Sequence, residues 1–193
     1  MKNTIVIAFL FFAVAVFGAP KNKPEAAKQG YSIKPSYADV SYGPHERNKL
    51  DFWQAKGNGP RPAVVFIHGG GWHRGDKSEV KDLENMKESY LDKGISCATI
   101  NYRFTSDALL PAPMRDAARA LQFIRWKAKE WNVDKGRIAV TGSSAGACSS
   151  VWMAMHDDMA DPKSDDPVLR ESTKPACAAT VNAQTCLDPE WIE

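Results

Sequence analysis

A sharp strand-to-helix bend centred on Ser144 is the feature of this sequence that most restricts its fold. The apolar residues 138–140 lead into Gly142-Ser143-Ser144-Ala145-Gly146, and a stretch rich in alanine and serine, 147–156, leads out of it. Only one frame of the pentapeptide fits the pattern G-x-S-x-G, and that frame selects Ser144. Such an abrupt turn needs small residues two positions on either side, which the two glycines supply. The pattern predicts a strand, a tight bend, and a helix whose first amides face the bend.

Strands and helices alternate along the rest of the chain. The continuous apolar run 63–67 is typical of a strand buried on both faces of a parallel sheet, and 95–102 reads in the same way. This alternation predicts an α/β fold, with a mostly parallel sheet, helices on both faces, and antiparallel strands at its N-terminal edge. The other elements that the pattern predicts are strands over 37–42, 49–54, 137–141 and 177–181, helices over 80–93 (ended by Gly94) and from Pro111 and Pro113 to Trp131, and a loop over 157–175.

Composition and charge fit one globular domain. The 193 residues are 44% hydrophobic and include six tryptophans, which suffices for a packed core. A net charge of +2 provides no strong field for nucleic acid or acidic lipid, so we expect neither as a partner. The four cysteines allow disulfides but leave their pairing open, and the absence of a CxxC pattern gives no sign of a metal site.

The N-terminus is predicted to be a secretory signal peptide. Lys2 precedes an apolar run, 5–17, that is too short to span a bilayer comfortably, and the small residue Gly18 follows. The alternative is an uncleaved membrane anchor. We therefore expect a secreted or periplasmic protein without a stable membrane anchor. Its predicted parts are a signal peptide over 1–18, a flexible linker over 19–36 and an α/β domain over 37–193.

A glycine-rich loop directly after the strand 63–67 is the second chemical signal. The loop reads His68-Gly69-Gly70-Gly71-Trp72. Consecutive glycines allow backbone amides to approach a carbonyl oxygen closely, and this loop type pairs with the serine bend in one class of hydrolase. Both segments follow predicted parallel strands, so both should lie at the sheet edge where open α/β sheets bind ligands.

These motifs resemble those of the esterase/lipase group of α/β-hydrolases. The segment 68–77, HGGGWHRGDK, together with GSSAG, is similar to hormone-sensitive-lipase-type enzymes and to feruloyl- or acetylxylan-esterase-like bacterial enzymes. The resemblance covers about 37–181. It implies a serine carboxylic-ester hydrolase that forms an acyl-enzyme on Ser144 and uses no metal or organic cofactor.

The resemblance also implies roles for neighbouring residues. Amides of Gly70, Gly71 and Ala145 match the family's oxyanion hole, with Trp72 as a further candidate. His68 matches a position that shapes the loop and does not act as the base, and the segment 101–103 is expected to be structural. The implied substrate is a small ester, and tryptophans 72 and 152 near the pocket permit an aromatic or carbohydrate-linked one.

The chain departs from the family in the residues that should activate the serine. In the family an acid and then a histidine follow the nucleophile along the chain, but His156 is the only histidine after Ser144. It lies about 18 Å away at helical rise, outside hydrogen-bonding reach. His45 and His73 match no position for the base. We therefore expect a C-terminally truncated hydrolase domain, without the family's later strands and nearly inactive by itself.

Three other functions remain open on the sequence. Residues 70–78 nearly match a phosphate-binding P-loop, but Asp76 stands between the glycine and Lys77, where its charge would face the phosphate. The missing base is also compatible with a catalytically dead binding module. A prolyl-peptidase-like hydrolase shares the serine bend, although the loop at 68–72 favours an esterase.

Overall fold

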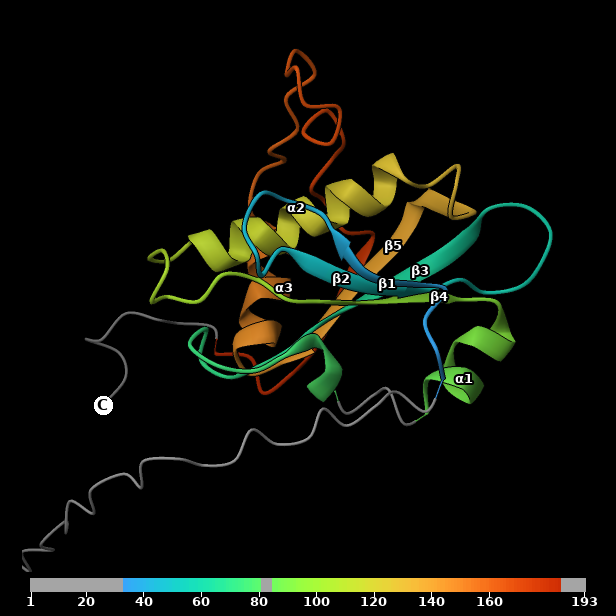
Figure 1. The fold of residues 1–193 in the computed structure, drawn as a ribbon, viewed down its shortest axis with the longest axis horizontal. Coiled ribbons are helices and arrows are strands. Elements are labelled where there is room, and N and C mark those ends of the chain that lie inside the picture. Colours follow the sequence, from blue (N-terminus) through green and yellow to red (C-terminus); the bar gives the residue numbers. More distant parts are fainter. Residues whose placement is uncertain (1–32, 81–84, 185–193) are drawn as a thin grey trace, which may run out of the picture.

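The computed structural model describes residues 33–80 and 85–184, which form a layered α/β unit (Figure 1). Its sheet has six strands in the order β1-β2-β4-β3-β5-β6. β2 runs antiparallel to β1 and β4, whereas β4, β3, β5 and β6 are parallel. The predicted fold class is confirmed. The strands are β1 (Tyr37–Ser41), β2 (Lys49–Trp53), β3 (Arg61–Ile67), β4 (Ser96–Ile100), β5 (Val133–Ser143) and β6 (Cys177–Val181).

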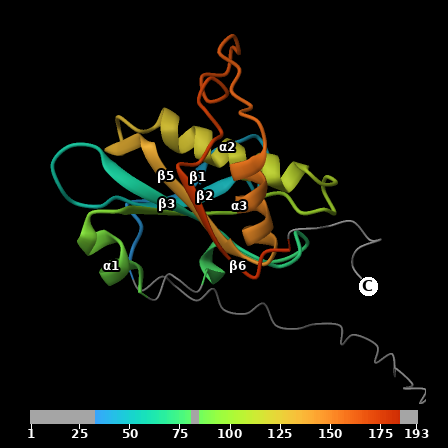
Figure 2. The same ribbon diagram turned by 180° about the vertical axis from the view of Figure 1, so that it is seen from behind.

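Helices cover both faces of the sheet, as Figures 1 and 2 show. The helices are α1 (Met86–Ser89), α2 (Ala112–Trp126) and α3 (Ala145–Met155). Successive side chains of β3 point to opposite faces of the sheet and pack in different core clusters. Val65 joins the larger core cluster with α2 and α3, and Phe66 joins a smaller cluster with Met86 of α1. This alternation explains why β3 reads as a continuous apolar run in the sequence.

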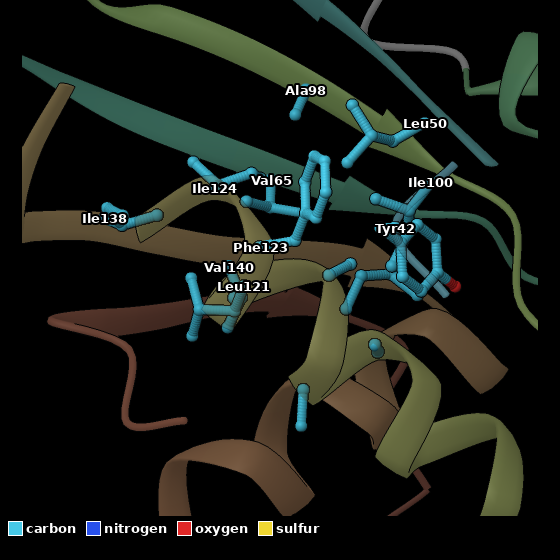
Figure 3. Packing of buried hydrophobic residues seen from close by; sticks show 14 of the residues in the cluster. Tyr42, Leu50, Val65, Ala98, Ile100, Leu121, Phe123, Ile124, Ile138 and Val140 are labelled. Carbon is cyan, nitrogen blue, oxygen red and sulfur yellow. The ribbon is translucent and has the colours of Figure 1, made fainter. Parts of the chain in front are cut away.

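The main core lies between α2 and the central strands (Figure 3). Leu121 and Ile124 of α2 are fully buried against Val65, Ile138 and Val140. Burial of each of these two helix side chains contributes about 2 kcal/mol to the free energy of unfolding. The spacing 121, 124 places both on one face of the helix, so α2 is fixed flat against the sheet that carries the bend.

Two predicted helices differ from the structure. Over 80–93, the described part contains only α1 and a 3-10 turn at Leu91–Lys93, because Tyr90 leaves the helical region and packs its ring edge-on against Phe66 at 5.4 Å. Gly94 ends this turn in the left-handed conformation, as predicted. The second helix ends at Trp126. Trp131 lies beyond it and stacks on a β2 residue, Phe52, at 4.5 Å.

Residues 156–176 form no helix or strand and stand out from the sheet as the orange-to-red loop in Figure 1, in agreement with the predicted loop. The base of this loop is tied to the helices. Arg125 of α2 donates to the carbonyl of Lys174. The Lys174 ammonium in turn donates to the carbonyls of Ala154 and His156, each at 2.7 Å, and so caps the C-terminus of α3.

The predicted signal peptide, 1–18, and most of the predicted linker, 19–36, lie outside the described residues. The last linker residues contact the domain, since Trp53 Nε1 donates to the carbonyl of Ile33 at 2.8 Å. Within the described ranges, no helix has the length and apolar character needed to cross a membrane. The described cysteines, 97, 148 and 177, are free thiols, and Cys186 lies outside the described residues.

Candidate active site

The structure places Ser144 at a strained bend between β5 and α3. Its backbone lies at φ 53° and ψ −121°, a region that non-glycine residues rarely occupy. The Ser144 carbonyl accepts the first helical hydrogen bond, from Cys148 N at 2.9 Å, and the Ser144 amide donates to the carbonyl of Val181 in β6 at 3.2 Å. The bend is therefore held from two sides. The neighbouring Ser143 is exposed, while Ser144 is half-buried.

The two glycines of the bend are required by close backbone contact. A Cβ atom at Gly142 would lie 2.5 Å from the carbonyl oxygen of Ile67, and one at Gly146 would lie 2.0 Å from the same oxygen. Both distances are far below van der Waals contact. The last residue of β3 therefore packs directly against both ends of the bend, which explains the small residues that the sequence pattern requires.

The glycine-rich loop crosses the bend at contact distance. A Cβ at Gly69 would lie 2.9 Å from the Ser143 carbonyl oxygen and 3.6 Å from the Cβ of Ser144. Gly70 and Gly71 have φ values of 104° and 63°, which favour glycine. The structure thus brings Ser144 together with the loop that carries two of the predicted oxyanion amides, and the third, Ala145, follows Ser144 directly at the start of α3.

One cleft of about 720 Å³ is shared by the two segments. Gly69, Gly70, Gly71 and Ser144 all line it. The tryptophans expected near the pocket do not. Trp72 turns its ring into the core, and the Trp152 ring lies 4.3 Å from that of His156, at the end of α3.

Side chains from other parts of the fold stabilise the glycine-rich loop through hydrogen bonds to backbone carbonyls. Tyr102 is fully buried, and its hydroxyl lies 2.8 Å from the His68 carbonyl and 3.2 Å from that of Gly69. The Arg47 guanidinium donates to the carbonyls of Tyr102, at 2.9 Å, and Gly75, at 3.0 Å. The sequence gives no signal for Arg47, because only the fold brings it beside the loop. The segment 101–103 has the structural role expected of it.

His68 is a buried, neutral part of the loop. Its ring stacks on Tyr102 at a centroid distance of 4.3 Å, and its Nδ1 lies 2.7 Å from the Gly69 carbonyl oxygen. That contact requires the proton on Nδ1, since a carbonyl oxygen only accepts. Burial lowers the pKa of His68 to about 4, so the ring stays uncharged at neutral pH. Its position agrees with a loop-shaping role.

No histidine is hydrogen-bonded to the Ser144 hydroxyl, which has no partner among the described residues. His156 lies at the end of α3, with its Nδ1 2.9 Å from the Asp157 carbonyl. His45 lies 4.0 Å from a carboxylate oxygen of Asp107. His73 lines the cleft but is exposed, and its Nδ1 lies 3.1 Å from the Gly71 carbonyl.

The lysine of the P-loop-like segment faces away from the loop. Lys77 is buried and donates to Asp51 at 2.6 Å and to Asp39 at 2.9 Å. Burial lowers the pKa of Lys77, but these hydrogen bonds outweigh it and raise the pKa above its ordinary value. Because two carboxylates already pair with its charge, Lys77 offers no free ammonium to a phosphate, and the structure gives no support to nucleotide binding. The described residues also contain no group of three or more His, Cys, Asp or Glu arranged to hold a metal ion.

Comparison with known proteins identifies a family. The family model BD-FAE matches residues 50–188. The probable carboxylic ester hydrolase LipM of Mycobacterium tuberculosis is 33% identical over 121 residues, which cover 61% of this chain and 28% of LipM. Esterase LipQ of the same organism is 28% identical over 147 residues, covering 74% of this chain and 32% of LipQ.

Solved structures agree on the fold. The acetyl ester-xyloside bifunctional hydrolase from Caldicellulosiruptor lactoaceticus matches with a TM-score of 0.60 and 33% identity, over 68% of this chain and 47% of that chain. Esterase 2 of Thermogutta terrifontis has a TM-score of 0.65 at 23% identity, over 85% of this chain and 63% of that chain, and shows the fold alone. The chain spans less than two thirds of the length of each of these four relatives.

Proposed function

The chain belongs to the BD-FAE family of α/β-hydrolase esterases and lipases, and on that premise we propose that it carries the nucleophile and oxyanion hole of a serine carboxylic-ester hydrolase. The observation that carries the proposal is the contact between the bend at Ser144 and the loop at Gly69, with both lining one cleft. The names of the relatives, carboxylic ester hydrolase and esterase, support the same reaction class.

In the proposed reaction, Ser144 Oγ attacks the ester carbonyl carbon. The carbonyl oxygen becomes an anion and accepts hydrogen bonds from the amides of Gly70, Gly71 and Ala145. These hydrogen bonds are stronger in the transition state than in the bound ester. The C–O bond to the alcohol then breaks, the alcohol leaves with a proton, and an acyl-enzyme remains on Ser144. Water releases the acid in a second attack.

The proton of the Ser144 hydroxyl needs an acceptor, and none of the four histidines of the chain contacts it. We therefore propose that the 193-residue chain turns over esters slowly. Loss of the base in such a site leaves only the residual rate that the oxyanion hole and substrate binding supply. Small acetyl esters, including carbohydrate-linked ones, are the proposed substrates, in line with the acetyl ester-xyloside hydrolase among the relatives.

A fluorophosphonate probe tests the nucleophile. We expect slow covalent labelling that mass spectrometry maps to Ser144. Ser144→Ala should abolish it, and Ser143→Ala, at the exposed neighbour, should retain it. Labelling that survives Ser144→Ala would refute the assignment. A chain that folds but takes no probe at Ser144 would favour the second candidate, a binding module with the fold's cleft. The absence of a histidine bonded to Ser144 among the described residues supports that candidate.

We also propose that the protein is exported, from the charge and apolar pattern of residues 1–18. Expression of the full chain followed by N-terminal sequencing of the exported product tests this. A mature N-terminus at Ala19 supports the proposal, and an uncleaved product that stays in the membrane contradicts it.

A further inference from the structure

A chain of two hydrogen bonds joins the glycine-rich loop to the helix that follows the nucleophile. The Trp72 indole is buried and its Nε1 donates to Ser149 Oγ at 3.1 Å. Ser149 is 1% exposed, and its hydroxyl donates to the Ala145 carbonyl at 2.9 Å. One hydroxyl therefore accepts from the loop and donates to the first residue of α3.

The two ends of this chain are the two parts of the proposed oxyanion hole. Trp72 directly follows Gly70 and Gly71, and Ala145 carries the third proposed amide. Trp72 is also fixed at its backbone, because its carbonyl accepts from Thr105 N at 2.8 Å and its φ is 58°, a left-handed value. A tryptophan in this conformation persists only where surrounding contacts hold it.

We propose that Ser149 is a positioning residue for the oxyanion hole, and this inference rests on the proposed function. Through the Trp72 indole, Ser149 sets the separation between the loop amides and the Ala145 amide. Oxyanion donors act when they lie about 2.7–3.1 Å from the developing charge, and a displacement of about 1 Å can cost about 100-fold in rate. Ser149 itself touches neither the cleft nor the reacting atoms.

Ser150 provides a matched control. It is fully buried on the same helix, and its hydroxyl donates to the carbonyl four residues earlier, that of Gly146, at 2.9 Å. It has the same back-bonding geometry as Ser149 but no hydrogen bond from the loop. Ser149→Ala and Ser150→Ala thus remove equivalent helix bonds, and only the first also removes the link to Trp72.

The experiment measures fluorophosphonate labelling of Ser144 in the full chain. In this reaction the Ser144 Oγ–P bond forms, the P–F bond breaks, and fluoride and the hydroxyl proton leave to solvent. The phosphonyl oxygen gains negative charge as the bond forms, so the rate reports on the oxyanion amides. We measure the maximal rate and the half-saturating probe concentration for Ser149→Ala, Ser150→Ala, Trp72→Phe, and the double variant Trp72→Phe/Ser149→Ala.

We expect Ser149→Ala and Trp72→Phe each to lower the maximal rate about 10-fold or more, with little change in half-saturation. The double variant should be no slower than the slower single variant, because both changes break one link. Ser150→Ala should stay within about twofold of the unmodified chain, with a loss of thermal stability similar to that of Ser149→Ala. Ser149→Thr, which keeps the hydroxyl, should recover part of the rate.

Two results would overturn the positioning role alone: equal rates for Ser149→Ala and Ser150→Ala, or multiplicative losses in the double variant. If the unmodified chain takes no probe at Ser144, the proposed function fails and the positioning role fails with it. The two failures are therefore distinguishable.

Discussion

The α-carbon of Gly146 packs so closely against the end of β3 that a Cβ there would lie 2.0 Å from the Ile67 carbonyl oxygen. The first turn of α3 and the last residue of β3 are thus in direct backbone contact. This contact brings the start of the glycine-rich loop, at His68, beside the bend at Ser144. The geometry of the site depends on a position that has no side chain.

Gly146→Ala should therefore disturb both stability and reactivity. The added methyl group must push α3 away from β3, and overpacking of this kind costs about 1–3 kcal/mol. We expect that loss in urea denaturation, together with loss of probe labelling at Ser144. Gly136→Ala is the control, because a Cβ there meets its nearest atom at 3.4 Å. Equal stability of the two variants would contradict the contact.

Removal of the Lys77 charge should be strongly destabilising. Asp51 is 1% exposed and would lose its buried cationic partner, and breaking a buried ion pair from one side costs about 3–5 kcal/mol. We expect a large fall in the denaturation midpoint of Lys77→Met. Lys87→Met breaks an exposed pair with Asp92 and should leave the midpoint unchanged. A small effect at Lys77 would contradict this prediction and show that the other partners of the Asp51 carboxylate suffice to stabilise it.

His68 should make the protein less stable in acid. Its pKa is about 4 in the folded chain and about 6.5 when unfolded, so the unfolded state binds the proton more tightly. Above pH 6.5 the imidazole is neutral in both states, so His68 costs the folded state no free energy. As the pH falls from 6.5 to 4, this difference in proton binding lowers the free energy of unfolding progressively, by about 3 kcal/mol at pH 4.

Denaturation of the unmodified chain and of His68→Phe across pH 4–8 measures this effect. The difference in stability between the two should narrow or reverse as the pH falls, because the variant has no imidazole to protonate. His156→Gln, at a half-buried histidine beyond the end of α3, is the control for removal of a histidine elsewhere in the chain. A difference between the first two that is independent of pH would contradict the shifted pKa.

Lys174→Met should loosen the end of α3. Its ammonium satisfies two of the last carbonyls of the helix, and loss of such a cap costs about 1 kcal/mol. We expect faster amide hydrogen exchange in the last turn of α3, while the bend at Ser144 stays protected. Lys163→Met, at an exposed lysine in the outer part of the same loop, should leave exchange unchanged. Equal exchange in the two variants would exclude the cap.

The sheet and the bend could be predicted from sequence because their signals are local. The apolar run of β3, the glycine spacing around Ser144 and the left-handed Gly94 each report on a few consecutive residues. The N-terminal antiparallel strands and the loop over 157–175 were also predicted correctly, from turn residues and from polarity with prolines.

The remaining features depend on contacts between distant parts of the chain. The predicted helix over 80–93 was wrong in length, because the packing of Tyr90 on Phe66 is decided across the sheet. The pairing of Lys77 with Asp51 and the hydrogen bond between Trp72 and Ser149 each join residues that are far apart in the sequence. The only sequence signal for Ser149 was a serine in a predicted helix rich in small residues. Nothing in the sequence identifies Trp72 as its hydrogen-bond partner.

The hydrogen bond from the Ser144 amide to the carbonyl of Val181 links the reactive bend to β6, whose five residues are all exposed. Because the amide of Ser144 is already engaged, it is not available to an anionic oxygen, and that task falls to the amide that follows it. Fraying of an outer strand usually leaves the centre of a protein untouched. Here, opening of the hydrogen bond at Val181 would release one side of the nucleophile, so we expect reactivity to decline on warming before the core unfolds.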